Sequence, residues 1–329
     1  MDFLLDSTHT DLAQAVTQIT TRAGGTDVAR AWSEGDRTAG LGVYARLAEA
    51  GITGLLVGDE LGGSGAGPVE MMVAVEQLGR CALPGPVAET FAVVPALLGA
   101  AGAVDALAPL LAGERAGSCA VPPVTPRAAD PEVADVYLLT GGVLSRGSAG
   151  TPLDTVDPTR QVADVTAGEV LAEGVDAVAA IDLGALATAA QSLGLAAAML
   201  DLAADYAKTR HQFGKAIGSF QAVKHHLADV AIAVEMARPL VWGAAVALEN
   251  EPHSDTATRD VSAAKVAAAE AADVAARRAL QVLGAIGYTA EHDFSLLLTK
   301  ARALRSAWGT PDWHRQRILE TLRTEAGTR

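Results

Sequence analysis

The chain has 329 residues, of which 50% are hydrophobic and 19% charged, and its mean hydropathy is +0.24. This apolar content supports a large core and excludes disorder as the main state. Acidic side chains outnumber basic ones 39 to 25, and the resulting net charge of -14 argues against a nucleic-acid-binding surface. Two cysteines in this length do not form a disulfide framework.

The amino terminus and the apolar segments argue against export and against a membrane span. The first residues lack a basic start, and Asp6 interrupts their apolar run, which is unlike a signal peptide. A transmembrane helix needs roughly 18 uninterrupted apolar residues, whereas charged side chains interrupt the alanine-rich segments. The nearest approach, residues 182–206, is rich in alanine and glycine and contains Asp201 and Asp205. We therefore expect a cytoplasmic protein that crosses no membrane.

Apolar residues at helical spacing dominate the first part of the chain. Alanine, the best helix former, is common, and glycine-rich or proline-rich stretches separate the segments. Pro68 and Pro86 suit the first turn of a helix, where a missing N–H group costs nothing. The predicted helices cover residues 8–22, 38–50, 68–81, 86–98 and 104–111.

A change of composition near Gly113 marks the start of a short β region. Prolines cluster there, and runs of β-branched residues appear between them. Gly141-Gly142 is expected to turn one strand into the next, which starts at Val143. The predicted strands cover residues 119–121, 136–140 and 161–166.

The remainder of the chain is predicted to be helical to its end. Long helices joined by short loops favour antiparallel neighbours and hence a four-helix bundle. Ser254 or Asp255 is expected to cap the third of these helices. The predicted helices cover residues 182–209, 220–250, 256–284 and 290–308, followed by a tail helix from residue 311. We expect a mainly α fold with three domains, at residues 1–115 (helical), 116–177 (reduced β) and 178–329 (helical bundle).

The connection between the first two long helices, residues 209–221, has an unusual composition. It combines a guanidinium group, two amides, aromatic side chains and glycines. Arg210 could bind a phosphate with its forked donors, and Gly214 could let backbone N–H groups approach an anion. The alternative is an ordinary helix–helix turn with solvated charges, which composition alone favours.

A second unusual segment, residues 281–291, lies at the end of the third long helix. Gly284 and Gly287 are typical of a helix C-terminus. Gln281 is expected on the buried side of the helix, where its amide would need a partner.

These two segments resemble motifs of the acyl-CoA dehydrogenase family. Residues 210–221 match an Arg-x-x-Phe-Gly-x-x-Ile-x-x-Phe-Gln pattern, and residues 281–288 match Gln-x-x-Gly-Gly-x-Gly-Tyr with Ala285 in place of one glycine. Residues 47–65 and 75–80 are similar to the family's first glycine loop and its Glu-x-Leu-Gly-Arg helix. The resemblance implies an N-terminal helical domain, a central β domain and a C-terminal four-helix bundle. It also implies FAD and the oxidation of acyl-CoA thioesters to 2,3-enoyl-CoA.

The sequence departs from that family where a catalytic base is needed. The family places a glutamate at one of two sites, and here Trp308 and Gly184 occupy the matching positions. Neither an indole nor a glycine hydrogen can remove an α proton. Asp182 is two residues from Gly184 and on a different helix face. The family's flavin-covering segments are not recognisable between residues 117 and 175.

The positions that the family uses to contact a neighbouring subunit's FAD are matched. The resemblance therefore implies a shortened, non-catalytic β-type subunit of an α2β2 acyl-CoA dehydrogenase of the actinobacterial type. FAD would be shared with the catalytic partner, which would also bind most of the acyl-CoA, with steroid side-chain thioesters as one substrate class. The implied FAD-contacting residues are Arg210, Gln212, Phe213, Gly214, Gln221, Gln281, Gly284 and Gly287.

Two alternatives stay open at this point. A self-sufficient flavoenzyme on the same fold would need another base, and Asp182, Glu291 and Asp312 are the candidates. Ordinary roles are expected for them, with Asp182 as a helix cap and the other two in first helical turns. The second alternative is a structural homologue that binds no cofactor.

Other notable side chains have ordinary explanations. A metal site at His225-His226 is not expected, because adjacent helical residues point in different directions and no third ligand follows. Trp308, Trp313 and His314 could line a ligand pocket or pack the last helix. Arg302 and Arg305 could meet a CoA phosphate, although a solvated helix face is the simpler expectation.

Overall fold

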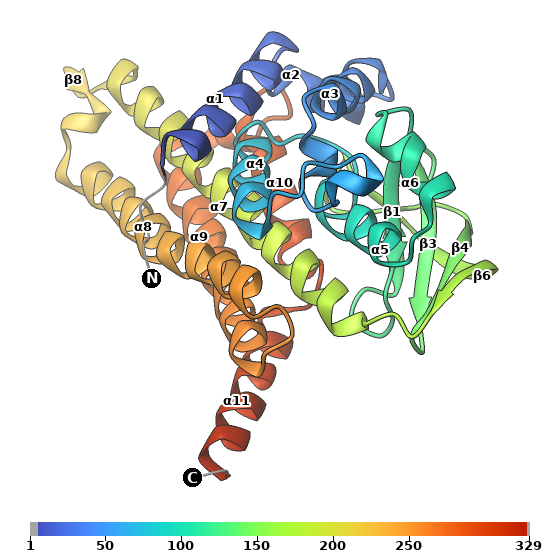
Figure 1. Ribbon diagram of the computed structural model, residues 1–329. Helices are drawn as coiled ribbons and strands as arrows, with labels where there is room; N and C mark the ends of the chain where they lie inside the picture. Colours follow the sequence, from blue (N-terminus) through green and yellow to red (C-terminus); the bar gives the residue numbers. More distant parts are fainter. Residues whose placement is uncertain (1–5, 328–329) are drawn as a thin grey trace.

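The computed structural model describes residues 6–327 and combines a six-stranded sheet with long helices (Figure 1). A mainly helical N-terminal part covers one side of the long bundle. The six-stranded sheet lies at the end of the molecule away from β8 (Lys215–Ala216). This arrangement agrees with the mainly α fold and central β region expected from the sequence. One core cluster runs through both helical parts and the inner face of the sheet.

The N-terminal part consists of short helices whose ends follow local capping chemistry. Asp6 caps the first helix by accepting a hydrogen bond from the backbone of His9, and the His9 side chain accepts from the backbone of Asp6. Pro68 takes a first-turn position, as predicted. The helices are α1 (Ser7–Arg22), α2 (Asp27–Ser33), α3 (Thr38–Glu49), α4 (Pro68–Arg80), α5 (Val94–Ala100) and α6 (Val104–Leu111), with short 3-10 turns at Ile52–Gly54 and Asp59–Leu61.

Two features of this part differ from the prediction. The seven-residue helix α2 was not predicted, because it is too short to display helical periodicity. The predicted helix 86–98 contains a π-helical turn, Glu89–Val93, that continues into α5. Such turns are rare in proteins, and those that occur often lie at functional sites.

The sheet contains six strands in the order β1-β3-β4-β6-β2, and β5 pairs with β6. Strands β1 and β3 are parallel and the other pairs are antiparallel. Gly141 and Gly142 turn β3 into β4 with positive φ angles, as predicted. Strands β2 and β5 were missed, since they have only three and two residues. The strands are β1 (Ala116–Ala120), β2 (Arg127–Ala129), β3 (Ala134–Thr140), β4 (Val143–Ala149), β5 (Leu153–Asp154) and β6 (Gln161–Glu173).

The C-terminal part is a bundle of long helices, as predicted. Asp176 caps α7, and Ser254 caps α9 through its hydroxyl oxygen. Helix α10 is shorter than the predicted segment 290–308, so Trp308 lies beyond its end. The helices are α7 (Ala177–Thr209), α8 (Gln221–Asn250), α9 (Asp255–Leu283), α10 (Phe294–Leu304) and α11 (Pro311–Gly327).

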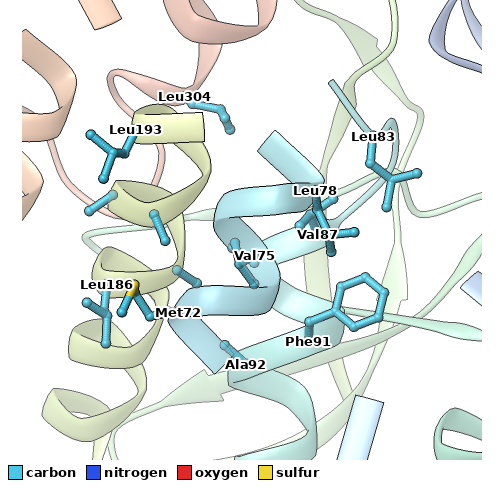
Figure 2. Packing of buried hydrophobic residues seen from close by; sticks show 14 of the residues in the cluster. Met72, Val75, Leu78, Leu83, Val87, Phe91, Ala92, Leu186, Leu193 and Leu304 are labelled. Carbon is cyan, nitrogen blue, oxygen red and sulfur yellow. The ribbon is translucent and has the colours of Figure 1, made fainter. Parts of the chain in front are cut away.

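Small residues bring α4 and α7 into backbone contact. A Cβ atom at Gly194 would lie 2.0 Å from the carbonyl oxygen of Glu76, and one at Gly79 would lie 2.2 Å from that of Gln191. Figure 2 shows the aliphatic side chains that fill the space beside this crossing, among them Leu186 of α7 and Met72 of α4. The two glycines thus permit the close packing of α4 against α7, because a Cβ atom at either position would overlap the backbone of the other helix.

Helices α7 and α8 are each long and apolar enough, by length and composition, to cross a membrane. In α7, 83% of the apolar window is buried within the molecule, so this helix is part of the core. In α8 only 33% of the window is buried. One face of α8 therefore presents apolar side chains to the outside.

Candidate functional site

Trp308 and Gly184, the two residues that replace the expected glutamates, lie against each other. A Cβ atom at Gly184 would be 2.2 Å from Cδ2 of the Trp308 indole, so only glycine fits beneath the ring. Trp308 is buried, with 1% of its surface exposed. The two positions, 124 residues apart in sequence, are therefore one place in the fold, and that place is filled by the indole.

A buried carboxylate closes the other side of the indole. Trp308 Nε1 donates a hydrogen bond to Glu89 Oε1 at 3.0 Å, and Arg160 Nη2 lies 3.7 Å from the same oxygen. Glu89 belongs to the π-helical turn, and its Oε2 atom is buried without a hydrogen-bond partner. Sequence reasoning missed Glu89, although it is the single acid within the apolar segment 86–98.

The turn that carries Trp308 is fixed from behind by a buried polar cluster. Lys265 Nζ donates to the carbonyl oxygen of Leu304 at 2.8 Å, and His314 Nε2 lies 2.9 Å from the carbonyl oxygen of Trp308. Burial lowers the pKa of His314 to about 4, so its ring is neutral near pH 7. His314 Nδ1 contacts the Ser262 hydroxyl at 3.1 Å. His314 therefore packs and holds the turn, as does Trp313, which meets it edge to face.

The turn at Trp308 and Gly309 requires positive backbone φ angles at both residues. Trp308 has a backbone φ angle of +56°, which residues other than glycine rarely adopt. The next residue, Gly309, has a φ of +97°. A Cβ atom at Gly309 would lie 2.7 Å from His314 Nε2. The strained placement of Trp308 is thus maintained by the surrounding contacts.

The carboxylates considered as alternative bases have structural surroundings. Asp182 is not a helix cap, because α7 starts earlier; it is buried within the helix, where it pairs with Arg317 and accepts a hydrogen bond from Thr258. Glu291 is exposed and precedes α10 instead of forming its first turn. Asp312 does lie in the first turn of α11, where it pairs with Arg315.

A buried ion pair connects the bundle with the β region. Lys300 Nζ of α10 lies 2.9 Å from Asp157 Oδ2, and both side chains are at most 2% exposed. Burial alone would raise the pKa of Asp157, but Lys300 and the bonds from Thr159 hold it below its usual value. Nearby, burial raises the pKa of Asp130 to about 6. These groups position the β region against α10 and the Trp308 turn.

The connection 209–221 forms a projecting hairpin instead of a plain turn. Strands β7 (His211–Gln212) and β8 (Lys215–Ala216) pair across Phe213 and Gly214, which both have positive φ angles. Phe213 is 91% exposed, and Lys215 Nζ lies 4.4 Å from the centre of the Phe220 ring. Arg210 caps the end of α7, and its exposed guanidinium makes no ion pair within residues 6–327. Gln212 and Gln221 are exposed on the same hairpin and at the start of α8.

Gln281 does not lie on the buried side of α9, contrary to the expectation. It is exposed and lines a cavity of about 840 Å³ between α8 and α9, together with His226, Asp229 and Arg278. Gly284 ends α9 with a φ of +65°, and a Cβ atom at Gly287 would lie 2.8 Å from Leu280 Cδ1. The cavity therefore brings together an amide, an imidazole, a carboxylate and guanidinium groups.

No group of three or more metal-ligating side chains occurs in the part of the chain that the structure describes. His226 Nδ1 instead lies 3.3 Å from Arg278 Nη1, and Arg278 also pairs with Asp229.

Comparison with known proteins matches both helical parts. The model "Acyl-CoA dehydrogenase, C-terminal domain" covers residues 174–322, and "Acyl-CoA dehydrogenase, N-terminal domain" covers residues 6–103. The chain is 32% identical over 319 residues to the acyl-CoA dehydrogenase IpdE2 of Mycobacterium tuberculosis (strain ATCC 25618 / H37Rv), across 95% of this chain and 96% of that protein.

Solved structures support the same fold. A chain of a Tcur3481-Tcur3483 steroid ACAD variant has a TM-score of 0.83 and 24% identity, over 97% of this chain and 99% of that one. A chain of the ChsE4-ChsE5 complex from Mycobacterium tuberculosis also has a TM-score of 0.83 and 24% identity, over 98% and 99%. The chain belongs to the acyl-CoA dehydrogenase family, and its helical, β and helical parts have the order of that fold.

The family's cofactor is FAD, and two regions of the chain differ in how they fit it. The place where the sequence resemblance leads one to expect a glutamate holds the Trp308 indole, which lies against Gly184. The hairpin, by contrast, offers an unpaired guanidinium, an exposed ring and a glycine turn, which suit a pyrophosphate and a planar base. The outward-facing half of the site therefore fits FAD better than the inward-facing half.

Proposed function

We propose that this chain is the non-catalytic subunit of a heteromeric, FAD-dependent acyl-CoA dehydrogenase. In this proposal two copies assemble with two copies of a catalytic subunit in the cytoplasm, and the partner supplies the glutamate base and most of the acyl-CoA contacts. The substrate is an acyl-CoA thioester, with steroid side-chain thioesters as the leading class. When FAD is bound, it would supply the acceptor for the hydride that is removed from the substrate.

The contact between Trp308 and Gly184 carries the non-catalytic part of the proposal. Both possible base positions lack a carboxylate, and the indole occupies their common space. Glu89 lies beside Trp308, but its Oε1 atom accepts the hydrogen bond from the indole and the residue is only 1% exposed. A general base must reach the proton that it removes, which a carboxylate sealed behind an indole does not do.

The projecting hairpin carries the FAD-contacting part. Arg210, Gln212, Phe213, Gly214 and Gln221 lie on or beside it and face outward. Gln281, Gly284 and Gly287 lie at the end of α9, and the first two are exposed. Exposed guanidinium and aromatic groups held by a short hairpin are suited to bind a ligand on a neighbouring subunit. These eight residues are therefore proposed to hold the pyrophosphate and adenine of the partner's FAD.

The outer face of α8 supports assembly. Ile232, Met236 and Leu240 recur every four residues on this helix and are 62%, 69% and 45% exposed. An apolar stripe of this kind marks a protein interface more often than a free surface. Two of the solved structures with this fold have paired names, the Tcur3481-Tcur3483 steroid ACAD variant and the ChsE4-ChsE5 complex.

The FAD contacts are tested by measuring the FAD affinity of the co-purified complex that carries Arg210→Ala. Removal of a charge-assisted phosphate contact is expected to weaken FAD at least tenfold, measured by flavin fluorescence during titration of the apo complex. Arg46→Ala is the matched control, because Arg46 is an exposed arginine on α3. Unchanged FAD affinity in Arg210→Ala would favour a cofactor-free structural role instead.

The self-sufficient alternative is tested in the same preparation. Under the proposal, Asp182→Asn, Glu291→Gln and Asp312→Asn each leave turnover of the complex unchanged within about twofold. Asp182→Asn should also lower the stability of the chain, because it weakens the ion pair with Arg317. Loss of turnover with normal folding in any of the three would assign a base to this chain.

A further inference from the structure

A cavity of about 410 Å³ lies between the β region and the end of α10. One side of it is formed by the connections from β1 to β2 and from β5 to β6, and the other side by α10 and the Trp308 turn. Among the described residues 6–327, none that lines it belongs to α9 or to the hairpin between α7 and α8. The cavity is therefore separate from the proposed FAD contacts, and its volume is within the range of small-molecule sites.

The charge of this cavity differs from that of the whole chain. Three arginines line it, and no acidic side chain does so within the part of the chain that the structure describes. Arg302 belongs to α10, whereas Arg127 and Arg160 belong to the β side. In a chain of net charge -14, such a lining gives a local positive potential that favours the approach of an anion.

The two more exposed arginines differ in their partners. Arg127 Nε lies 2.8 Å from Asp164 Oδ1, in a pair whose side chains are both largely in solvent. Arg302 makes no ion pair or hydrogen bond to any residue between 6 and 327. Arg302 is exposed, as expected for a solvated helix face, whereas Arg305 is partly buried and does not line this cavity. Arg302 thus presents a complete set of guanidinium donors at the cavity.

Arg160 is the most buried of the three arginines, with 11% of its side chain exposed. Its Nη2 atom lies 3.7 Å from Glu89 Oε1, which is beyond hydrogen-bond distance, and this oxygen already accepts a hydrogen bond from Trp308. Glu89 and Asp130, the acids that interact with Arg160, are 1% and 6% exposed, and neither lines the cavity. The charge of Arg160 therefore meets no acid on the cavity side.

Most of the remaining wall is apolar. The indole of Trp308 contributes to it, and the Nε1 atom of this indole is directed to Glu89 instead of the cavity. Three hydroxyl groups, on Thr125, Thr155 and Ser306, interrupt the apolar surface. The aliphatic side chains of the wall are those of Val124, Pro126, Val156, Val162, Ala303 and Ala307. A ligand that fits this wall has an apolar body between its charged groups.

We propose that this cavity binds a small dicarboxylate with an apolar body, with one carboxylate on Arg302 and the other on Arg160. Guanidinium groups bind carboxylates through paired, charge-assisted hydrogen bonds. Two carboxylates match the two arginines that lack a close acidic partner, since Asp164 already pairs with Arg127. Because these arginines come from opposite sides of the cavity, the arrangement favours two separated charges over one compact anion.

Titration calorimetry with isophthalate tests the site in the full chain, in the oligomeric form in which it purifies. Arg302→Met removes an exposed side chain without a partner, so it should fold normally and raise the Kd at least tenfold. The matched control Arg46→Met removes an exposed arginine of α3 and should leave the Kd unchanged. Failure of the wild-type chain to bind isophthalate, or an unchanged Kd in Arg302→Met, would overturn the proposal.

Two further variants test the other parts of the cavity. Arg160→Lys keeps a positive charge beside Glu89 but removes the paired donors, and it should raise the Kd at least threefold. Ala303→Phe fills the cavity while keeping all three arginines, and it should abolish binding. Tight binding by the Ala303→Phe variant would place the ligand elsewhere, even if Arg160→Lys does not fold.

Other ligands test the chemistry of the site. Benzoate has one charge, inorganic phosphate has no body, and phenyl phosphate has a compact dianion, so each should bind at least tenfold more weakly than isophthalate. Equal or tighter binding of any of them would contradict the two-carboxylate site. Riboflavin should not displace isophthalate, and displacement would make the cavity a flavin site instead. Arg210→Ala should leave the Kd for isophthalate unchanged, which keeps this test distinct from that of the FAD contacts.

Discussion

The indole of Trp308 packs on the Cα atom of Gly184, so the two residues exclude any side chain at position 184. A Cβ atom there would be 2.2 and 2.3 Å from ring atoms Cδ2 and Cε3. In the family resemblance these are the two alternative positions of the catalytic glutamate. Their contact explains why both differ from glutamate together: the large ring at one position requires the absence of a side chain at the other.

This complementarity predicts a strongly non-additive pair of substitutions. Gly184→Ala should destabilise the chain by about 1–3 kcal/mol, because the new methyl group overlaps the indole. Trp308→Ala should cost about 3–5 kcal/mol through the cavity that it leaves. In the double variant the methyl group enters the vacated space, so the combined loss should be smaller than the sum. Denaturant unfolding of all four proteins measures the cycle, and simple additivity would contradict the contact.

The hydrogen bond from Trp308 to Glu89 can be isolated from the packing. Trp308→Phe keeps an aromatic ring but removes the donor, which leaves the buried Glu89 carboxylate with less support. The expected loss of stability is about 1–3 kcal/mol. Adding Glu89→Met should lower stability further, because the largely buried Arg160 then loses its carboxylate partner. Recovered stability with Glu89→Met in the Trp308→Phe background would show that Arg160 does not depend on this carboxylate.

Lys265 predicts a pH dependence of stability. Its folded pKa is about 7, lowered by burial and by Arg305 and Arg160, whereas an unfolded lysine titrates near 10.5. Between these values the unfolded chain binds more protons, so the free energy of unfolding rises with pH, by at most about 1.4 kcal/mol per unit. Relative to Lys265→Met, the wild-type chain should therefore gain stability from pH 7 to pH 9. Parallel pH profiles of the two proteins would show that Lys265 does not titrate as described.

The apolar stripe on α8 predicts where the partner binds. Met236→Lys places a charge in the middle of the stripe and should weaken the complex at least tenfold, as measured by analytical ultracentrifugation of the mixed subunits. Val170→Lys is the matched control, because Val170 is a 56% exposed apolar residue on β6. An intact complex with Met236→Lys, or equal loss with both variants, would remove α8 from the proposed interface.

Local sequence patterns predict many of the elements but not their contacts. Helix α6 occupies the predicted residues 104–111, and the Gly141-Gly142 turn is where the glycine pair indicates it, since both depend on short-range chemistry. Gln281 was placed on the wrong face of α9, because the side that packs depends on which neighbours α9 meets. The hairpin between α7 and α8 was likewise expected as a turn.

In the candidate site, too, the sequence identified some positions but not the contacts between them. The motifs identified positions 184 and 308, but their contact across 124 residues depends on how α7 and the Trp308 turn pack. Glu89 was not singled out, because a lone acid in an apolar helix gives no local sign that an indole will reach it. The buried, unpaired atom of Arg305 is also a property of packing, and sequence alone favoured a solvated face.

The central claim is that this chain helps to hold FAD but contributes no catalytic base, and the FAD content of the purified complex tests it most directly. The chain alone should be colourless and inactive. The complex with its catalytic partner should be yellow and active, with one FAD for every two chains. A yellow and active protein obtained from this chain alone, or one FAD for every chain in the complex, would contradict the account.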